Sequence, residues 1–159
     1  MSLVTISSVE RMTAKNLADM LLAAGASQQQ SPDPSIAIID VRDDDYIGGH
    51  IKSSMHFPSR SLDAMLPTLL RKLEDKQTVV FHCALSQQRG PSAALQYLRA
   101  KEEAASPQKG DGKGEVEDAG KPRQKVYVLD RGFVGWQEVY GPDERLTEGY
   151  RKELWEEGY

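Results

Sequence analysis

The chain has 159 residues, of which 39% are hydrophobic, and its formal net charge is −4 at pH 7. We expect residues 1–159 to form one domain, because this length suits a single hydrophobic core. The negative charge disfavours wholesale binding of nucleic acid. No apolar run approaches the ~18 residues of a membrane helix, and the first residues lack the pattern of a secretory signal. We therefore expect no membrane partner and a cytoplasmic or nuclear location.

Strand-like and helix-like patterns alternate along the chain. The apolar run at 3–7 predicts a strand, and a helix at 13–25 follows, with Thr13 as its cap and Gly25 at its end. Further along, we expect strands at 36–41 and 53–57, a helix at 61–76 that Pro67 can kink or break, a strand at 78–82, a helix at 91–104, a strand at 125–130, and helices at 132–140 and 145–157. This alternation predicts an α/β sandwich with a mainly parallel sheet.

Residues 106–124 differ in composition from the rest. They are rich in Gly, Pro, Lys and acidic residues, and they show no apolar period. Such a segment cannot bury enough surface to order itself, so we expect a flexible insertion.

Cys83 is the only cysteine in the chain, and it stands where the strand at 78–82 ends. A single cysteine excludes an internal disulfide and a multi-cysteine zinc site, so we expect no metal and no cofactor. Arg89 follows six positions later, at the start of a helix, which gives the spacing Cys-x5-Arg. The turn between them can curl around a tetrahedral oxyanion with its N–H groups pointing inward. The planar fork of Arg89 can clasp two of the oxygens of that anion.

The same positive field acts on sulfur, because a helix N-terminus and an arginine both favour a thiolate. Cys83 is then a nucleophile beneath the bound anion. The structural alternative is a small buried apolar residue at a strand end. His82, its neighbour, can likewise be a core histidine whose ring nitrogens have hydrogen-bond partners and which has no catalytic role.

Three motifs carry a resemblance to a known family. FHCALSQQRGP resembles the active-site loop of the small rhodanese-fold phosphatases related to the M-phase inducer (cell-division-cycle twenty-five) family, and it is closer to the compact plant and fungal members described as tyrosine phosphatases or arsenate reductases. IIDVRDDDYIGGHIKSS resembles the rhodanese segment with an Asp-x-Arg strand end, and VLDRGFVGW resembles the terminal Gly-Phe-x-Gly-Trp signature. The resemblance implies a rhodanese-like three-layer sandwich whose five-stranded, mainly parallel sheet has helices on both faces.

The resemblance also implies roles for single residues. Cys83 is expected to be the nucleophile and Arg89 the oxyanion clamp. The rest of the phosphate-binding loop is expected to be Ala84, Leu85, Ser86, Gln87 and Gln88. Asp40 is expected to support the loop or Arg42 by accepting hydrogen bonds, with His82 as a further supporting residue. His50 and Arg131 are interpreted as scaffold residues, and Trp136 as part of the core.

The loop departs from the inducer enzymes at two positions. Those enzymes carry glutamates where this chain has Ala84 and Gln88, so a general acid for the leaving group is missing from the loop. Asp43, Asp44 and Asp45 lie nearby in sequence and could replace it. We favour a simpler interpretation, in which these three carboxylates form an exposed charge cluster at the start of a helix.

The leading hypothesis for function is a cysteine-based phosphatase that cleaves phosphotyrosine or aryl phosphate esters through a phosphocysteine intermediate. An arsenate reductase that uses glutathione and glutaredoxin is the main alternative. A non-catalytic phosphate-sensing module and a sulfurtransferase are further alternatives, although sulfurtransferases of this fold usually have a loop one residue shorter. The expected partners are a phosphorylated protein or a small oxyanion, with glutaredoxin as a possible reductant; the sequence leaves the oligomeric state open.

Overall fold

The computed structural model describes residues 9–26, 35–85, 88–105 and 124–156. In chain order its elements are β1 (Glu10–Met12), α1 (Ala14–Ala26), β2 (Ile36–Asp40), β3 (His50–Ile51), β4 (Met55–His56), a 3-10 turn (Ser59–Ser61), α2 (Leu62–Leu73), β5 (Thr78–His82), α3 (Arg89–Ala105), β6 (Lys125–Leu129), α4 (Gly132–Tyr140), β7 (Thr147–Glu148) and α5 (Lys152–Glu156). The predicted strand at 3–7 lies outside the described residues.

Five strands form the central sheet in the order β1-β6-β5-β2-β4, and all their pairings are parallel. The register pairs Asp40, the last residue of β2, with His82, the last residue of β5. These two neighbouring strands therefore end at the same level, and the residues that follow them meet at one edge of the sheet. This is the edge where ligands bind in open parallel sheets.

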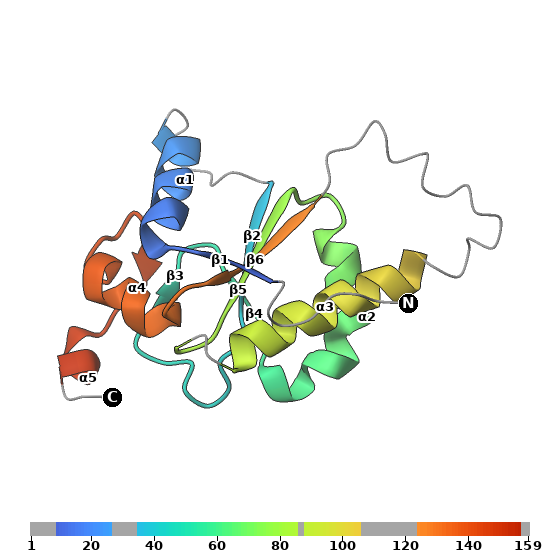
Figure 1. Ribbon diagram of the computed structural model, residues 1–159. Coiled ribbons are helices and arrows are strands. Elements are labelled where there is room, and N and C mark those ends of the chain that lie inside the picture. Colours follow the sequence, from blue (N-terminus) through green and yellow to red (C-terminus); the bar gives the residue numbers. More distant parts are fainter. Residues whose placement is uncertain (1–8, 27–34, 86–87, 106–123, 157–159) are drawn as a thin grey trace.

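Helices cover both faces of the sheet, as Figure 1 shows, so the predicted three-layer architecture is confirmed. Alternate strand residues point to opposite faces. Ile39 and Phe81 pack with α2 and α3, whereas Ile38 and Val80 pack with α1 and α4. β2 and β5 are thus apolar on both sides, which explains their continuous hydrophobic runs.

The predicted helix at 145–157 is wrong over its first half. Thr147 and Glu148 form β7, which pairs antiparallel with β3 in a separate two-stranded sheet. Gly149 has a φ of 67°, a left-handed backbone conformation that neither a strand nor a right-handed helix can continue through. Thr147 is buried, and its Oγ1 accepts a hydrogen bond from Trp136 Nε1 at 2.9 Å. Between residues 145 and 156, where the structure describes this segment, the helix is limited to Lys152–Glu156.

Two smaller expectations concern helix boundaries. The N–H of Asn16 donates to Thr13 Oγ1 at 3.1 Å, so Thr13 does cap α1, although the helix continues past Gly25. Pro67 lies inside α2 without ending it. Pro67 is exposed, so water can reach the backbone carbonyl that loses its partner there.

Gln124 fixes the chain immediately before β6. Its amide nitrogen donates to the carbonyl oxygens of Leu73 and Lys76, and its amide oxygen accepts from Tyr97 and Lys101. Gln124 therefore does not belong to a flexible insertion, whereas residues 106–123 lie outside the described part of the chain. Among the described helices, none combines the length and the apolar character that a membrane crossing would require.

Candidate active site

Cys83 follows β5 directly and is 3% exposed. The carbonyl oxygens of Cys83 and Ala84 accept hydrogen bonds from the backbone N–H groups of Phe133 and Val134, each at 2.9 Å. These amides belong to the first turn of α4, where N–H groups lack partners within the helix. The Gly-Phe-x-Gly-Trp segment thus holds two successive backbone carbonyl groups, those of Cys83 and Ala84.

Gly132 makes this contact possible. Its φ is 57°, and a Cβ atom placed on it would lie 2.5 Å from the carbonyl oxygens of both Cys83 and Ala84. Any other residue would push the start of α4 away from the loop. The roles of Gly132 and Phe133 were missed from sequence, although the motif that contains them was noted.

Arg89 begins α3, and two carboxylates bind its guanidinium. Nη1 and Nη2 donate to the two oxygens of Asp45 at 2.9 and 2.7 Å, and Nη1 also donates to Asp43 at 3.2 Å. Asp43 in turn accepts hydrogen bonds from Ser59 Oγ at 2.6 Å and from the N–H of Arg60. The interpretation of residues 43–45 as an exposed cluster at a helix start is therefore wrong for Asp43 and Asp45. No helix begins there, and both face Arg89.

These contacts change the acidity of the carboxylates. Hydrogen bonds from Arg89 lower the pKa of Asp45 to about 2. Burial acts to raise the pKa of Asp43, but hydrogen bonds from Ser59, Arg60 and Arg89 outweigh it and lower that pKa. The same hydrogen bonds, which Arg89 donates to Asp45, raise the pKa of Arg89 further above its ordinary value. Both carboxylates are ionised and Arg89 is charged at neutral pH.

A buried ion pair supports the loop that carries Asp43 and Asp45. Asp40 and Arg42 are fully buried, and Nε and Nη2 of Arg42 donate to Asp40 at 3.1 and 2.7 Å. Nη1 and Nη2 also donate to the carbonyl oxygens of Ile47 and Gly49, at 3.3 and 2.8 Å. Asp40 thus holds Arg42, as expected from the sequence, and Arg42 holds the backbone of residues 47–49.

His82 lies between this pair and Cys83. It is fully buried, and its Nδ1–H donates to the carbonyl oxygen of Cys83 at 3.0 Å. Among the described residues its Nε2 finds no hydrogen-bond partner, and this atom lies 3.7 Å from an oxygen of Asp40. Burial lowers the pKa of His82 even though Asp40 acts in the opposite direction. His82 is therefore neutral in the folded protein at neutral pH.

We expect this neutral histidine to reduce stability in acid. An unfolded histidine has a pKa of about 6.5, whereas the folded pKa is lower, so below pH ~6.5 the unfolded state binds the additional proton. The stability present above that pH is lost as the pH falls toward the folded pKa, by up to ~1.4 kcal/mol per pH unit. His82→Asn does not titrate and keeps a donor near the carbonyl of Cys83. Its urea unfolding free energy should vary less than that of the wild type between pH 7.5 and 5, and parallel curves would contradict this.

The structure describes the other predicted site and scaffold residues only in part. Ser86 and Gln87 lie outside the described residues, whereas Leu85 and Gln88 are exposed. His50 pairs with Glu148 and Arg131 with Glu138, and Trp136 is buried in the core. Within the described ranges, no group of three or more His, Cys, Asp or Glu side chains could hold a metal ion.

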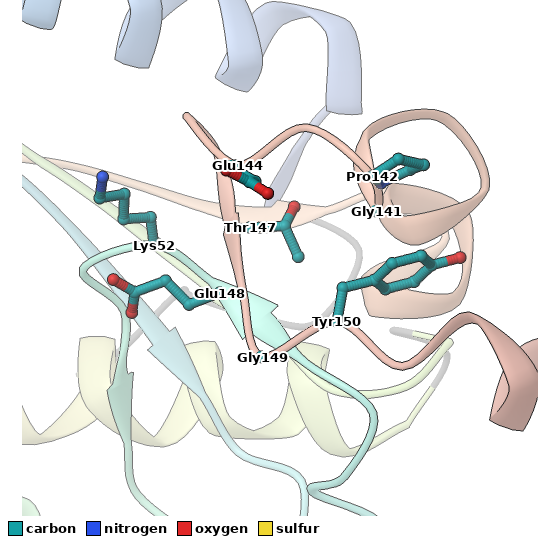
Figure 2. A pocket seen from close by; sticks show the side chains of 8 residues that line it. All are labelled: Lys52, Gly141, Pro142, Glu144, Thr147, Glu148, Gly149 and Tyr150. Atoms are coloured by element: carbon teal, nitrogen blue, oxygen red, sulfur yellow. The ribbon is translucent and has the colours of Figure 1, made fainter.

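An open pocket of about 590 Å³ lies elsewhere, between the two-stranded sheet of β3 and β7 and the end of α4. Figure 2 shows the side chains of Lys52, Glu148 and Tyr150 at its wall. It contains no predicted site residue, and it is polar and open, so we place the candidate chemistry at Cys83 instead.

The fold agrees with comparisons to known proteins. Residues 21–139 match the model of the Rhodanese-like domain. The chain therefore belongs to the rhodanese-like domain family.

Individual relatives include enzymes of two kinds. The chain is similar to CDC25-like phosphatase YCH1 of Saccharomyces cerevisiae, with 40% identity over 128 residues that cover 74% of this chain and 76% of the relative. It is also similar to Arsenate reductase 2.2 of Oryza sativa subsp. japonica, with 42% identity over 106 residues, 66% of this chain and 72% of the relative. The solved structure of Saccharomyces cerevisiae Ygr203w, described as a homolog of single-domain rhodanese and the Cdc25 phosphatase catalytic domain, superposes with a TM-score of 0.73 at 34% identity and covers 95% of this chain and 94% of its own.

Proposed function

We propose that this protein is a cysteine-dependent phosphatase that hydrolyses phosphotyrosine and other aryl phosphate esters. One observation carries the proposal. Cys83 and Arg89 stand at the two ends of one loop that joins β5 to α3, at the carboxyl edge of the parallel sheet. Asp45 holds the guanidinium of Arg89 in place through two hydrogen bonds. The similarity to the yeast CDC25-like phosphatase supports it.

The orientation of Arg89 suits a bound oxyanion. Its Nη1–Nη2 end binds Asp45, and among the described residues no hydrogen bond uses its Nε. A guanidinium offers a second pair of donors along its Nε–Nη2 edge. Arg89 can therefore bind equatorial phosphate oxygens with that edge while Asp45 fixes the other end. The carboxylate acts as an orienting partner, and it does not need to leave when an anion binds.

The proposed reaction has two steps. Cys83 Sγ attacks phosphorus, the bond from phosphorus to the phenolic oxygen breaks, and its electron pair leaves with the phenolate. Water then attacks the phosphocysteine, releases inorganic phosphate and restores the thiolate. Arg89 and the loop amides stabilise the charge on the equatorial oxygens in both steps.

The acidity of Asp43 and Asp45 predicts a strong dependence on the leaving group. Both carboxylates bind Arg89 and are ionised at neutral pH, so neither is poised to protonate a departing alkoxide. General acid help is commonly worth ~10²–10⁴-fold. We expect kcat/KM for p-nitrophenyl phosphate and a phosphotyrosine peptide to exceed that for the matching phosphoserine peptide by about this factor. Equal values for the three substrates would reveal an acid outside these two residues.

Arsenate reduction is the second candidate, and the similarity to the rice arsenate reductase favours it. Cys83 would displace an oxygen from arsenate to form an S–As bond. The thiol of glutathione would then attack Cys83 Sγ, so that As(V) leaves as As(III) and a mixed disulfide remains. A glutaredoxin would reduce that disulfide. Arsenate has no alkoxide leaving group, so the lack of a loop acid matters less for this reaction.

A further inference from the structure

Residues 151–156 at the C-terminal end of the described chain pack against the loop that carries Asp43 and Asp45. Trp155 Nε1–H donates to the carbonyl oxygen of Gly48 at 3.0 Å, and the backbone N–H of Arg151 donates to the same oxygen at 3.3 Å. Gly48 has a φ of 78°, and a Cβ atom placed there would lie 2.8 Å from Trp155 Nε1. The indole ring thus lies directly on the backbone at Gly48.

Gly48 is the midpoint of a short span that is fixed from two directions. On the buried side, Arg42 binds the carbonyl oxygens of Ile47 and Gly49. On the other side, Trp155 binds the carbonyl oxygen between them. Asp45, which fixes Arg89, stands three residues before Gly48. The position of the Asp45 carboxylate therefore depends on how firmly residues 47–49 are held.

Trp155 also supports the other half of the site. Its ring lies against Phe133, with ring centroids 5.6 Å apart. The Phe133 ring lies 4.4 Å from the guanidinium carbon of Arg42, and the Phe133 N–H binds the carbonyl oxygen of Cys83. The indole therefore influences the catalytic loop indirectly, through its contacts with Gly48 and Phe133.

We propose that Trp155 is a positioning residue for the reaction, which holds residues 43–49 so that Asp45 keeps Arg89 in the orientation for oxyanion binding. The role rests on the function proposed above. Misplacement of a catalytic group by about 1 Å can cost ~10²-fold in rate. We expect Trp155→Phe, which keeps a ring but loses the donor, to lower kcat/KM for p-nitrophenyl phosphate about 3- to 10-fold. Trp155→Ala should lower it by more.

A double-mutant cycle separates this role from a general loss of stability. Asp45→Asn weakens the hold on Arg89 directly, and we expect a loss of about tenfold. If Trp155 acts through Asp45, Trp155→Phe should cause little further loss of kcat/KM in the Asp45→Asn background, measured well below the melting temperature of each variant. Losses that multiply, or a Trp155→Phe variant with wild-type kinetics, would overturn the proposal.

A second measurement needs no turnover. The chain has two tryptophans, so the emission of Trp155 is taken as the spectrum of each protein minus that of the same protein carrying Trp155→Phe. It should change in Asp45→Asn, because the loop beneath the indole shifts when Arg89 loses its partner. Asp44→Asn is the matched control, since Asp44 belongs to the same loop but is exposed and pairs with Arg60; its emission should match the wild type. Unchanged emission in Asp45→Asn would overturn the coupling. An emission change in a protein without activity on p-nitrophenyl phosphate would instead reject the phosphatase function and leave the coupling standing.

Discussion

Replacing Cys83 by serine should abolish turnover of p-nitrophenyl phosphate, with kcat/KM at least ~10³-fold below that of the wild type. Serine has nearly the same shape, but its hydroxyl is not ionised at neutral pH and is a far weaker nucleophile than a thiolate. Cys83 is part of the core that packs on α2 and α3, so the variant must first be shown to melt as the wild type does. Tungstate binding by the folded variant would show that the loop is intact.

The same variant tests the second candidate function. Arsenate reduction with glutathione and glutaredoxin should also disappear in Cys83→Ser, because the S–As bond cannot form. Activity that survives this substitution in both assays would reject both enzymatic hypotheses, because both place the reacting sulfur on Cys83.

Arg89→Lys should lower kcat/KM for p-nitrophenyl phosphate by ~10²–10³-fold, the usual effect of removing an oxyanion donor. Lysine keeps the charge, but it cannot bind Asp45 with one pair of donors while it offers a second pair to the phosphate. The affinity for tungstate should fall together with kcat/KM, since the same edge of Arg89 binds both.

Arg60→Lys provides the matched control for this substitution. Arg60 pairs with Asp44, which lies in the acidic loop that also carries Asp43 and Asp45. The side chain of Arg60 is largely exposed. We expect its kinetics to stay within about twofold of the wild type, because exposed ion pairs contribute little. A similar loss in both variants would mean that the loss in Arg89→Lys does not come from a lost contact between Arg89 and the anion.

The parts of the fold that sequence predicted well are those with a strong periodic pattern. β2 and β5 are buried on both faces, and their apolar runs identified a parallel sheet with Cys83 at its carboxyl edge. The 145–157 segment was misread because Leu146 and Leu154 match a helical period by chance. Leu146 is in fact buried next to β7, in an irregular path. Such a path follows from tertiary contacts, here that of Thr147 with Trp136, which local periodicity cannot show.

The acidic loop could not be assigned correctly for a related reason. Asp43 and Asp45 precede Arg89 by more than forty residues, and only the parallel pairing of β2 with β5 brings their loops together. A closer reading was possible, because both strands were predicted to belong to one parallel sheet, whose strands end at a common edge. The sequence offered no way to tell which of the three aspartates faces inward.

The anchoring of Gln124 has a consequence for how this protein can vary. β6 starts beside the first residue of β5, with Lys125 paired to Thr78, so the connection from α3 enters at the end of the sheet remote from Cys83. Gln124 ties that entry to the last residue of α2 and to the middle of α3. Substitutions that remove these hydrogen bonds should therefore loosen this end of the sheet and leave the Cys83 edge in place.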